Sequence, residues 1–86
     1  MLYTIRKMNL YSSNTYSDED GTAEEVKSAM IYATKDELLK ICDFFEKVKE
    51  HLNDNDNCHM HLCDNYEEWS KVKNFDLEVN LIGNAE

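Results

Sequence analysis

The sequence predicts one α+β domain of two layers, in which a long helix covers one face of a four-stranded, mostly antiparallel sheet. Three observations lead to this fold class. One segment repeats apolar residues at helical spacing, and several short segments have the composition or alternation of strands. Their order along the chain is strand, strand, helix, strand, short helix, strand. Because 86 residues leave room for one core only, residues 1–86 are predicted to form a single domain.

The N-terminal part is predicted to contain two strands joined by a long loop. Residues 2–11 are rich in aromatic and β-branched side chains, which is typical of a strand. A second strand is expected from about Val26 to Ala33. Between the two, residues 12–25 are polar and acidic and contain Gly21, so they predict a mobile acidic loop.

The clearest element is a helix that begins after Thr34. Thr34 and Glu37 have the spacing of a capping box, in which each side chain accepts a hydrogen bond from the other residue's backbone amide. Apolar residues then recur at steps of three and four and predict one buried stripe: Leu38, Ile41, Cys42, Phe45, Val48 and Leu52. The helix is expected to end at the Asn/Asp run 53–57, whose side chains compete for backbone hydrogen bonds.

Two strands with regular alternation are predicted in the C-terminal third. Residues 58–63 place Cys58, Met60 and Leu62 on one side. In residues 75–81 the core-facing positions are expected to be Phe75, Leu77, Val79 and Leu81. Between these strands, residues 64–69 predict a short capped helix, or at least a helical turn. Trp69 is expected to fill one end of the core, the alternative being an exposed binding anchor.

A two-layer fold leaves the second face of the sheet uncovered by the helix. The alternation assigns six residues to this face: His59, His61, Cys63, Asp76, Glu78 and Asn80. Polar and ionisable groups on an uncovered face are typical of an interface. Alternatively, the acidic loop folds over these residues and leaves no site.

The charge balance indicates which partners the chain prefers. It carries 18 acidic against 9 basic residues, for a formal charge of −9. Nucleic acids and anionic membranes are bound through clustered basic residues, so neither is expected as a partner. An acidic surface suits a basic protein instead, although the same charge also keeps a small protein dissolved.

The cysteines and the lack of long apolar runs predict a compartment. The three cysteines, Cys42, Cys58 and Cys63, are an odd number, and the N-terminus has no signal-like apolar run. Both observations predict a reducing cytoplasm. No segment approaches the roughly 20 apolar residues that span a membrane.

The run Cys58-His59-Met60-His61-Leu62-Cys63 has residue types that bind metals. On a strand, His59 and His61 share a face about 7 Å apart, a spacing that two imidazoles can close onto one ion. Cys58 points to the other face, and Cys63 lies about 13 Å from His59. If the last two strands pair, Glu78 or Asp76 could supply a third ligand. The alternative is a pair of surface histidines without metal.

No catalytic constellation is found in the sequence. Motifs for nucleotide, dinucleotide or serine-hydrolase chemistry are absent, and a thiol enzyme would need a third group beside His61 and Cys63. We therefore expect no enzymatic activity and no cofactor.

The C-terminal third resembles small immunity proteins of bacterial polymorphic toxin systems. The resemblance is carried by His59-Met60-His61-Leu62, by Asp64 and Trp69, and by the alternating strand Phe75 to Ile82. It implies an inhibitor that binds a cognate toxin in the cytoplasm and has no catalysis of its own.

The sequence thus predicts a non-enzymatic acidic protein that blocks a protein partner, such as a basic toxin. The expected contact residues are acids of the loop and ionisable groups of the sheet face: Asp18, Glu19, Asp20, Glu24, Glu25, His59, His61, Asp76 and Glu78. Two alternatives remain open. One is a metal-binding protein that uses His59, His61 and Glu78, and the other is a homo-oligomer, for example a dimer, that pairs sheet faces or edges.

Overall fold

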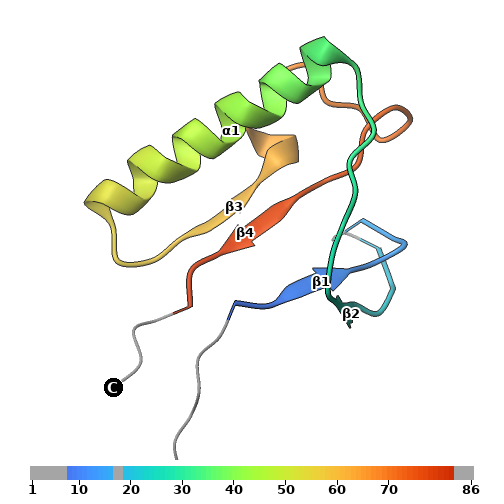
Figure 1. The fold of residues 1–86 in the computed structure, drawn as a ribbon, viewed down its shortest axis with the longest axis horizontal. Helices are drawn as coiled ribbons and strands as arrows, with labels where there is room; N and C mark the ends of the chain where they lie inside the picture. Colours follow the sequence, from blue (N-terminus) through green and yellow to red (C-terminus); the bar gives the residue numbers. More distant parts are fainter. Residues whose placement is uncertain (1–7, 17–18, 83–86) are drawn as a thin grey trace, which may run out of the picture. The chain divides into compact units, whose positions relative to one another are not determined.

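Four short strands and one long helix make up the regular structure of residues 8–16 and 19–82, which the computed structural model describes (Figure 1). The α+β class is therefore as predicted. The strands, however, form two separate two-stranded antiparallel sheets, so the predicted four-stranded sheet is wrong. Contacts divide the chain into two compact units between Tyr32 and Ala33, and each is described by itself.

The first unit contains a hairpin of β1 (Leu10–Ser12) and β2 (Glu24–Val26). The strands are antiparallel, with Leu10 opposite Val26 and Ser12 opposite Glu24. Asn9 Nδ2 donates to Glu25 Oε2 at 2.7 Å beside this pairing. The segment 12–25, predicted as a loop, thus begins and ends inside strands.

Both predicted N-terminal strands have different bounds in the structure. Of the first, residues 2–7 lie outside the described residues, and the strand found is Leu10–Ser12. The second ends at Val26, where it was predicted to begin. Its expected centre, Met30 to Tyr32, is exposed and unpaired in the sheet, because these apolar side chains follow one another without the alternation that gives a strand one buried face.

The helix α1 (Lys35–Asp54) begins where the sequence predicts. Thr34 is its N-cap, and the capping box is complete. Glu37 N donates to Thr34 Oγ1 at 3.2 Å, and Thr34 N donates to Glu37 Oε1 at 2.9 Å. These bonds satisfy amides that the first turn leaves without a helical partner. Asn55, in the predicted Asn/Asp run, is the C-cap.

The buried side of α1 includes Ile41 and Val48 of the predicted stripe but is rotated away from the rest of it. Ile41, Phe44 and Val48 are buried, and Phe44 is completely enclosed, whereas Phe45 is 46% exposed. Positions 41, 44 and 48 satisfy helical spacing as well as the predicted set does, so periodicity alone could not choose between the two phenylalanines. Of the predicted stripe, four residues are exposed: Leu38, Cys42, Phe45 and Leu52.

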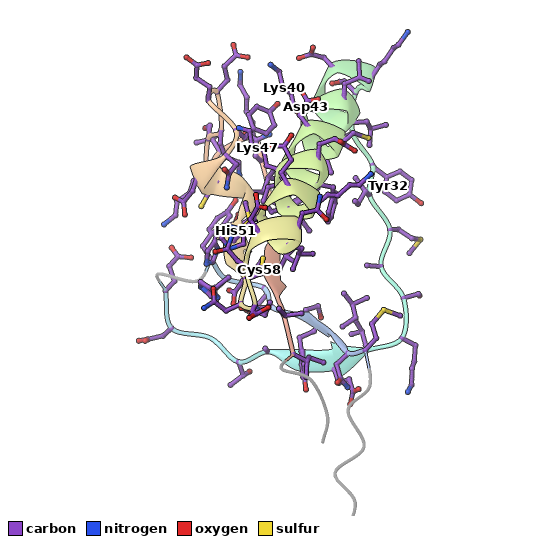
Figure 2. All side chains as sticks on the ribbon, turned by 90° about the vertical axis from the view of Figure 1, so that its left-hand side faces the viewer. Tyr32, Lys40, Asp43, Lys47, His51 and Cys58 are labelled. Atoms are coloured by element: carbon purple, nitrogen blue, oxygen red, sulfur yellow. The ribbon has the colours of Figure 1, made fainter. Side chains whose placement is uncertain are left out.

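A charged row occupies another side of α1. Lys40, Asp43, Lys47 and His51 follow one another along the helix in Figure 2. His51 also helps to close the C-terminal end, because its Nε2 donates to Asn57 O at 3.0 Å. Asn55 Nδ2 donates to His51 O at 2.9 Å.

The second sheet pairs β3 (His59–His61) with β4 (Glu78–Asn80), and α1 lies along it (Figure 1). Backbone hydrogen bonds extend the same register on both sides, from Leu62 N to Leu77 O at 2.8 Å and from Leu81 N to Cys58 O at 2.9 Å. The last two strands therefore pair, which is the condition under which Glu78 or Asp76 could supply a third ligand.

One face of this sheet completes the core under α1. Cys58 and Leu62 are buried with the helix residues, and Met60, Leu77 and Val79 pack against them, as the alternation predicts. Phe75 and Leu81 were also expected to face the core, but both are exposed. Both lie outside β4, which spans only Glu78–Asn80.

The connection from β3 to β4 contains helical turns and no α-helix, so the second of the two predicted forms is found. Residues Leu62–Asp64 form the 3-10 helix η1, and Trp69 N donates to Tyr66 O at 3.0 Å to close a further turn. Trp69 packs against the core, as expected, and its Nε1 donates to Phe75 O at 2.8 Å. The indole thus links this connection by a hydrogen bond to the segment that precedes β4.

Candidate functional site

The face of the β3–β4 sheet that points away from the core carries a cluster of polar side chains. The register places His59 opposite Asn80 and His61 opposite Glu78. Because side chains alternate along a strand, these four residues share one face. We call this face, together with Cys63 and Asp76 at its end, the polar sheet face. Its six members are those that the sequence assigns to the uncovered side.

Asp76 holds the His61 imidazole in place. Its Oδ2 lies 2.9 Å from His61 Nδ1, and its Oδ1 accepts a hydrogen bond from Cys63 N at 2.9 Å. The side chains of this pair are only 15% and 12% exposed. The hydrogen bond to Asp76 raises the pKa of His61, and the charges of Asp76, Glu78 and Asp64 act in the same direction.

Asn80 plays the corresponding role for His59. Its Oδ1 lies within hydrogen-bond distance of His59 Nδ1. Its Nδ2 donates to Glu78 Oε2 at 2.9 Å. The amide is thus oriented at both ends, with its oxygen toward the imidazole.

The two imidazoles meet at their outer nitrogens. His59 Nε2 and His61 Nε2 are 3.2 Å apart, and the rings cross edge to face. Glu78 Oε1 lies 3.7 Å from His61 Nε2. One donor atom from each of His59, His61 and Glu78 lies within 4.8 Å of the others, so the three can reach one ion.

A second group of possible ligands lies at the other end of the polar sheet face. His61, Cys63 and Asp76 also bring one donor atom each within 4.8 Å. Burial, followed by the charges of Asp76 and Asp64, raises the pKa of the Cys63 thiol to about 11. The thiol is therefore protonated at neutral pH in the metal-free protein.

The acids predicted for the loop lie on or beside the hairpin of the first unit. Asp18 lies outside the described residues. Glu19 and Asp20 are exposed between the strands, and the Glu19 carboxylate accepts a hydrogen bond from Tyr16 N at 3.2 Å. Glu24 and Glu25 are exposed on β2.

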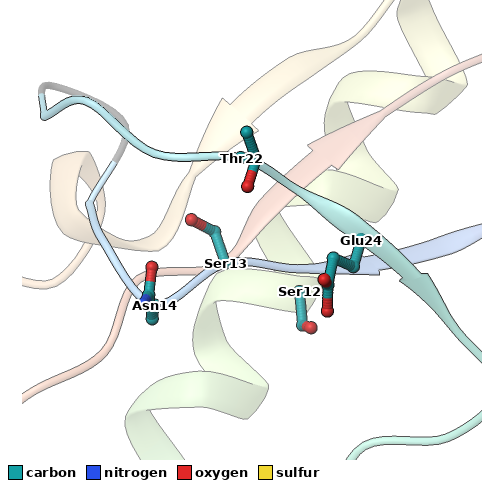
Figure 3. Close-up of a pocket in the computed structure, with 5 residues that line it drawn as sticks. All are labelled: Ser12, Ser13, Asn14, Thr22 and Glu24. Atoms are coloured by element: carbon teal, nitrogen blue, oxygen red, sulfur yellow. The ribbon is translucent and has the colours of Figure 1, made fainter.

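A pocket of about 290 Å³ lies beside this hairpin. Figure 3 shows Ser12, Ser13 and Asn14 on one side of it and Thr22 and Glu24 on the returning segment. Its described lining residues are polar, and Glu24 is the one charged residue among them. All five lining residues come from the first unit, so the pocket contains none of the histidine cluster.

The predicted site residues therefore form two groups. His59, His61, Asp76 and Glu78 are brought together by one strand pair, while the described acids lie in the other unit. The sequence analysis placed Asn80 on the right face but missed its role in orienting His59. It named Asp76 as a possible ligand but missed that both of its oxygens are hydrogen-bonded, one to the His61 ring and one to Cys63 N. Only the register, which the alternation does not fix, could have revealed either role.

Comparison with protein-family models, with curated proteins and with solved structures finds no match to this chain. Within residues 8–16 and 19–82, no helix combines the length and the apolar character needed to cross a membrane.

Proposed function

We propose that this protein is a non-enzymatic acidic binding protein that blocks a basic protein partner, as an immunity protein blocks a toxin. The observation that carries the proposal is the charge of the exposed hairpin. The described part of the first unit contains four exposed acidic residues and a single basic residue, Lys27. Such a surface attracts a basic partner and repels nucleic acid.

Exposed apolar side chains in the same unit support a protein as the partner. Tyr11 is exposed on β1, and Met30 and Tyr32 are exposed after β2. Aromatic residues and methionine are enriched at protein interfaces relative to the rest of protein surfaces. The three cysteines are free thiols, which supports the cytoplasm as the compartment.

Capture of the partner from the native host tests the proposal. The full-length chain is compared with a hairpin-acid variant, in which Glu19, Asp20, Glu24 and Glu25 are replaced by their amides. These isosteric changes remove charge but keep oxygen acceptors for Tyr16 N and Asn9 Nδ2. We expect one stoichiometric basic protein with the natural chain, released at high salt and not captured by the variant.

The matched control is a helix-acid variant that removes the same charge from another surface. Its four changes are Asp43→Asn, Glu46→Gln, Glu50→Gln and Asp54→Asn, all at exposed positions of α1. Electrostatic attraction at the hairpin predicts that this variant still captures the partner. Equal capture by the natural chain and both variants would contradict the proposal.

A further inference from the structure

We propose that His59, His61 and Glu78 form a binding site for one divalent late first-row transition-metal ion of the Zn²⁺ class. The ligand atoms are Nε2 of each histidine and a carboxylate oxygen of Glu78. This site is independent of the acidic hairpin, because all of its residues belong to the second unit.

The hydrogen bonds of the two inner nitrogens assign the tautomers. An ionised carboxylate only accepts, so His61 Nδ1 carries the hydrogen that Asp76 receives. Asn80 turns its oxygen to His59 because its amide nitrogen donates to Glu78, so His59 Nδ1 also carries a hydrogen. In the neutral rings, both Nε2 atoms therefore hold lone pairs.

These lone pairs converge at a distance that fits a shared ion. When both rings are neutral in these tautomers, two lone pairs 3.2 Å apart repel each other unless a proton or a metal ion lies between them. With Zn–N bonds of roughly 2.0–2.1 Å, two ligands of a tetrahedral site lie about 3.3–3.4 Å apart. The observed separation is thus close to one edge of such a site.

Glu78 and a solvent molecule complete the coordination. The carboxylate, 41% exposed, lies across the register from His61, with Oε1 3.7 Å from Nε2. This separation exceeds the edge of a tetrahedral zinc site, about 3.3–3.4 Å, by only a few tenths of an ångström. His59, at 63% exposure, leaves the outer side open to water as the fourth ligand.

The residues that hydrogen-bond to the proposed histidine ligands distinguish this site from the alternative group that contains Cys63. Metal-binding histidines almost always donate their other N–H to a carboxylate, carbonyl or water, which fixes the ring. Asp76 and Asn80 supply these acceptors. In the proposed site, Asp76 orients His61 through Oδ2, while its Oδ1 accepts from Cys63 N. Imidazole ligands favour Zn²⁺, Cu²⁺ or Ni²⁺ over Mg²⁺ and Ca²⁺.

Titration of the tag-free, chelator-treated full-length chain with Zn²⁺ and Co²⁺ tests the proposal. We expect one equivalent of metal per chain and a Co²⁺ spectrum without a sulfur-to-cobalt charge-transfer band. Asn80→Ala removes the acceptor for His59 and is expected to lower the affinity by about 10- to 100-fold. His59→Ala, at an exposed position, lowers it further, and circular dichroism checks that the fold is retained.

Two variants serve as matched controls. His51→Gln removes the histidine of α1, which is not part of the polar sheet face. Cys63→Ser removes the thiol of the alternative group of ligands, His61, Cys63 and Asp76. Both are expected to bind metal as the natural chain does, and so is the hairpin-acid variant. The proposal is overturned if no stoichiometric binding occurs, if His59→Ala binds normally, or if Cys63→Ser abolishes binding together with a charge-transfer band.

Discussion

Single hydrogen bonds decide which nitrogen of each histidine carries its hydrogen. His59 and His61 use Nδ1 toward oxygen acceptors, whereas His51 uses Nε2 toward Asn57 O and accepts at Nδ1 from Asn55. The protein thus contains both tautomers, each set by its partner.

This difference can be measured in one long-range ¹H–¹⁵N spectrum of the metal-free protein, recorded at a pH where the rings are neutral. We expect His59 and His61 to show the Nδ1–H tautomer and His51 to show Nε2–H. His51 is the internal control. The same tautomer for all three rings would contradict the assignment on which the lone-pair argument depends.

Burial separates two neighbouring phenylalanines in α1. Phe44→Ala should destabilise the protein by about 3–5 kcal/mol, because it removes a fully enclosed ring and leaves a cavity. Phe45→Ala serves as the matched control and should cost much less, since that ring is 46% exposed. Urea unfolding of both variants measures the difference, and equal losses would show that the buried side of the helix is assigned wrongly.

At the scale of elements, the sequence predicts those whose signals are local. The start of α1 follows from Thr34 and Glu37, which lie three residues apart. The faces of β3 and β4 follow from strict alternation in each strand. The side of the helix that faces the core, by contrast, depends on whether Phe44 or Phe45 packs with Leu62 and Cys58. Helical spacing permits both.

The N-terminal strands were harder to predict for a different physical reason. Each observed strand has three residues, and its position depends on which partner it meets across the hairpin. Residues 30–32 have strand-forming side chains but no partner strand within the described residues, so propensity alone was misleading. For the candidate site, the ligand types and their shared face were predictable, whereas the roles of Asp76 and Asn80 depend on register.

The capping box of α1 predicts a pH-dependent contribution to stability. The hydrogen bond from the Thr34 backbone amide lowers the pKa of Glu37 below its ordinary value of 4.5. A carboxyl group whose pKa is lower in the folded state stabilises the protein above the unfolded pKa, and this contribution is lost as the pH falls through the folded pKa.

Glu37→Gln separates this effect from the titration of the other acids. Glutamine keeps the capping bond but has no carboxyl to titrate. We therefore expect the stability difference between the natural chain and Glu37→Gln to shrink as the pH falls through and below 4.5. Thermal unfolding of both chains at pH values above and below 4.5 measures this stability difference. A difference that does not change with pH would argue against the capping interaction.

For the whole molecule, the excess of acids predicts that salt stabilises the fold. A net charge of −9 on 86 residues causes self-repulsion, which ions screen over about 10 Å at 0.1 M salt. We expect the melting temperature to rise when salt is added to a low-salt solution. The helix-acid variant, whose charge is −5 after four of the nine excess negative charges are removed, should show a smaller rise. A fall in melting temperature for the natural chain would show that attractive charge pairs dominate instead.

The boundary between Tyr32 and Ala33 makes the histidine site a self-contained piece of sequence. Downstream of it lie the helix with its own cap, both paired strands, the three proposed ligands and the two residues that orient the imidazoles. None of these interactions involves a residue of the β1–β2 hairpin. Substitutions in the first 32 residues can therefore change the proposed partner surface without replacing any of the proposed metal ligands, so the two halves of the chain are free to diverge at different rates.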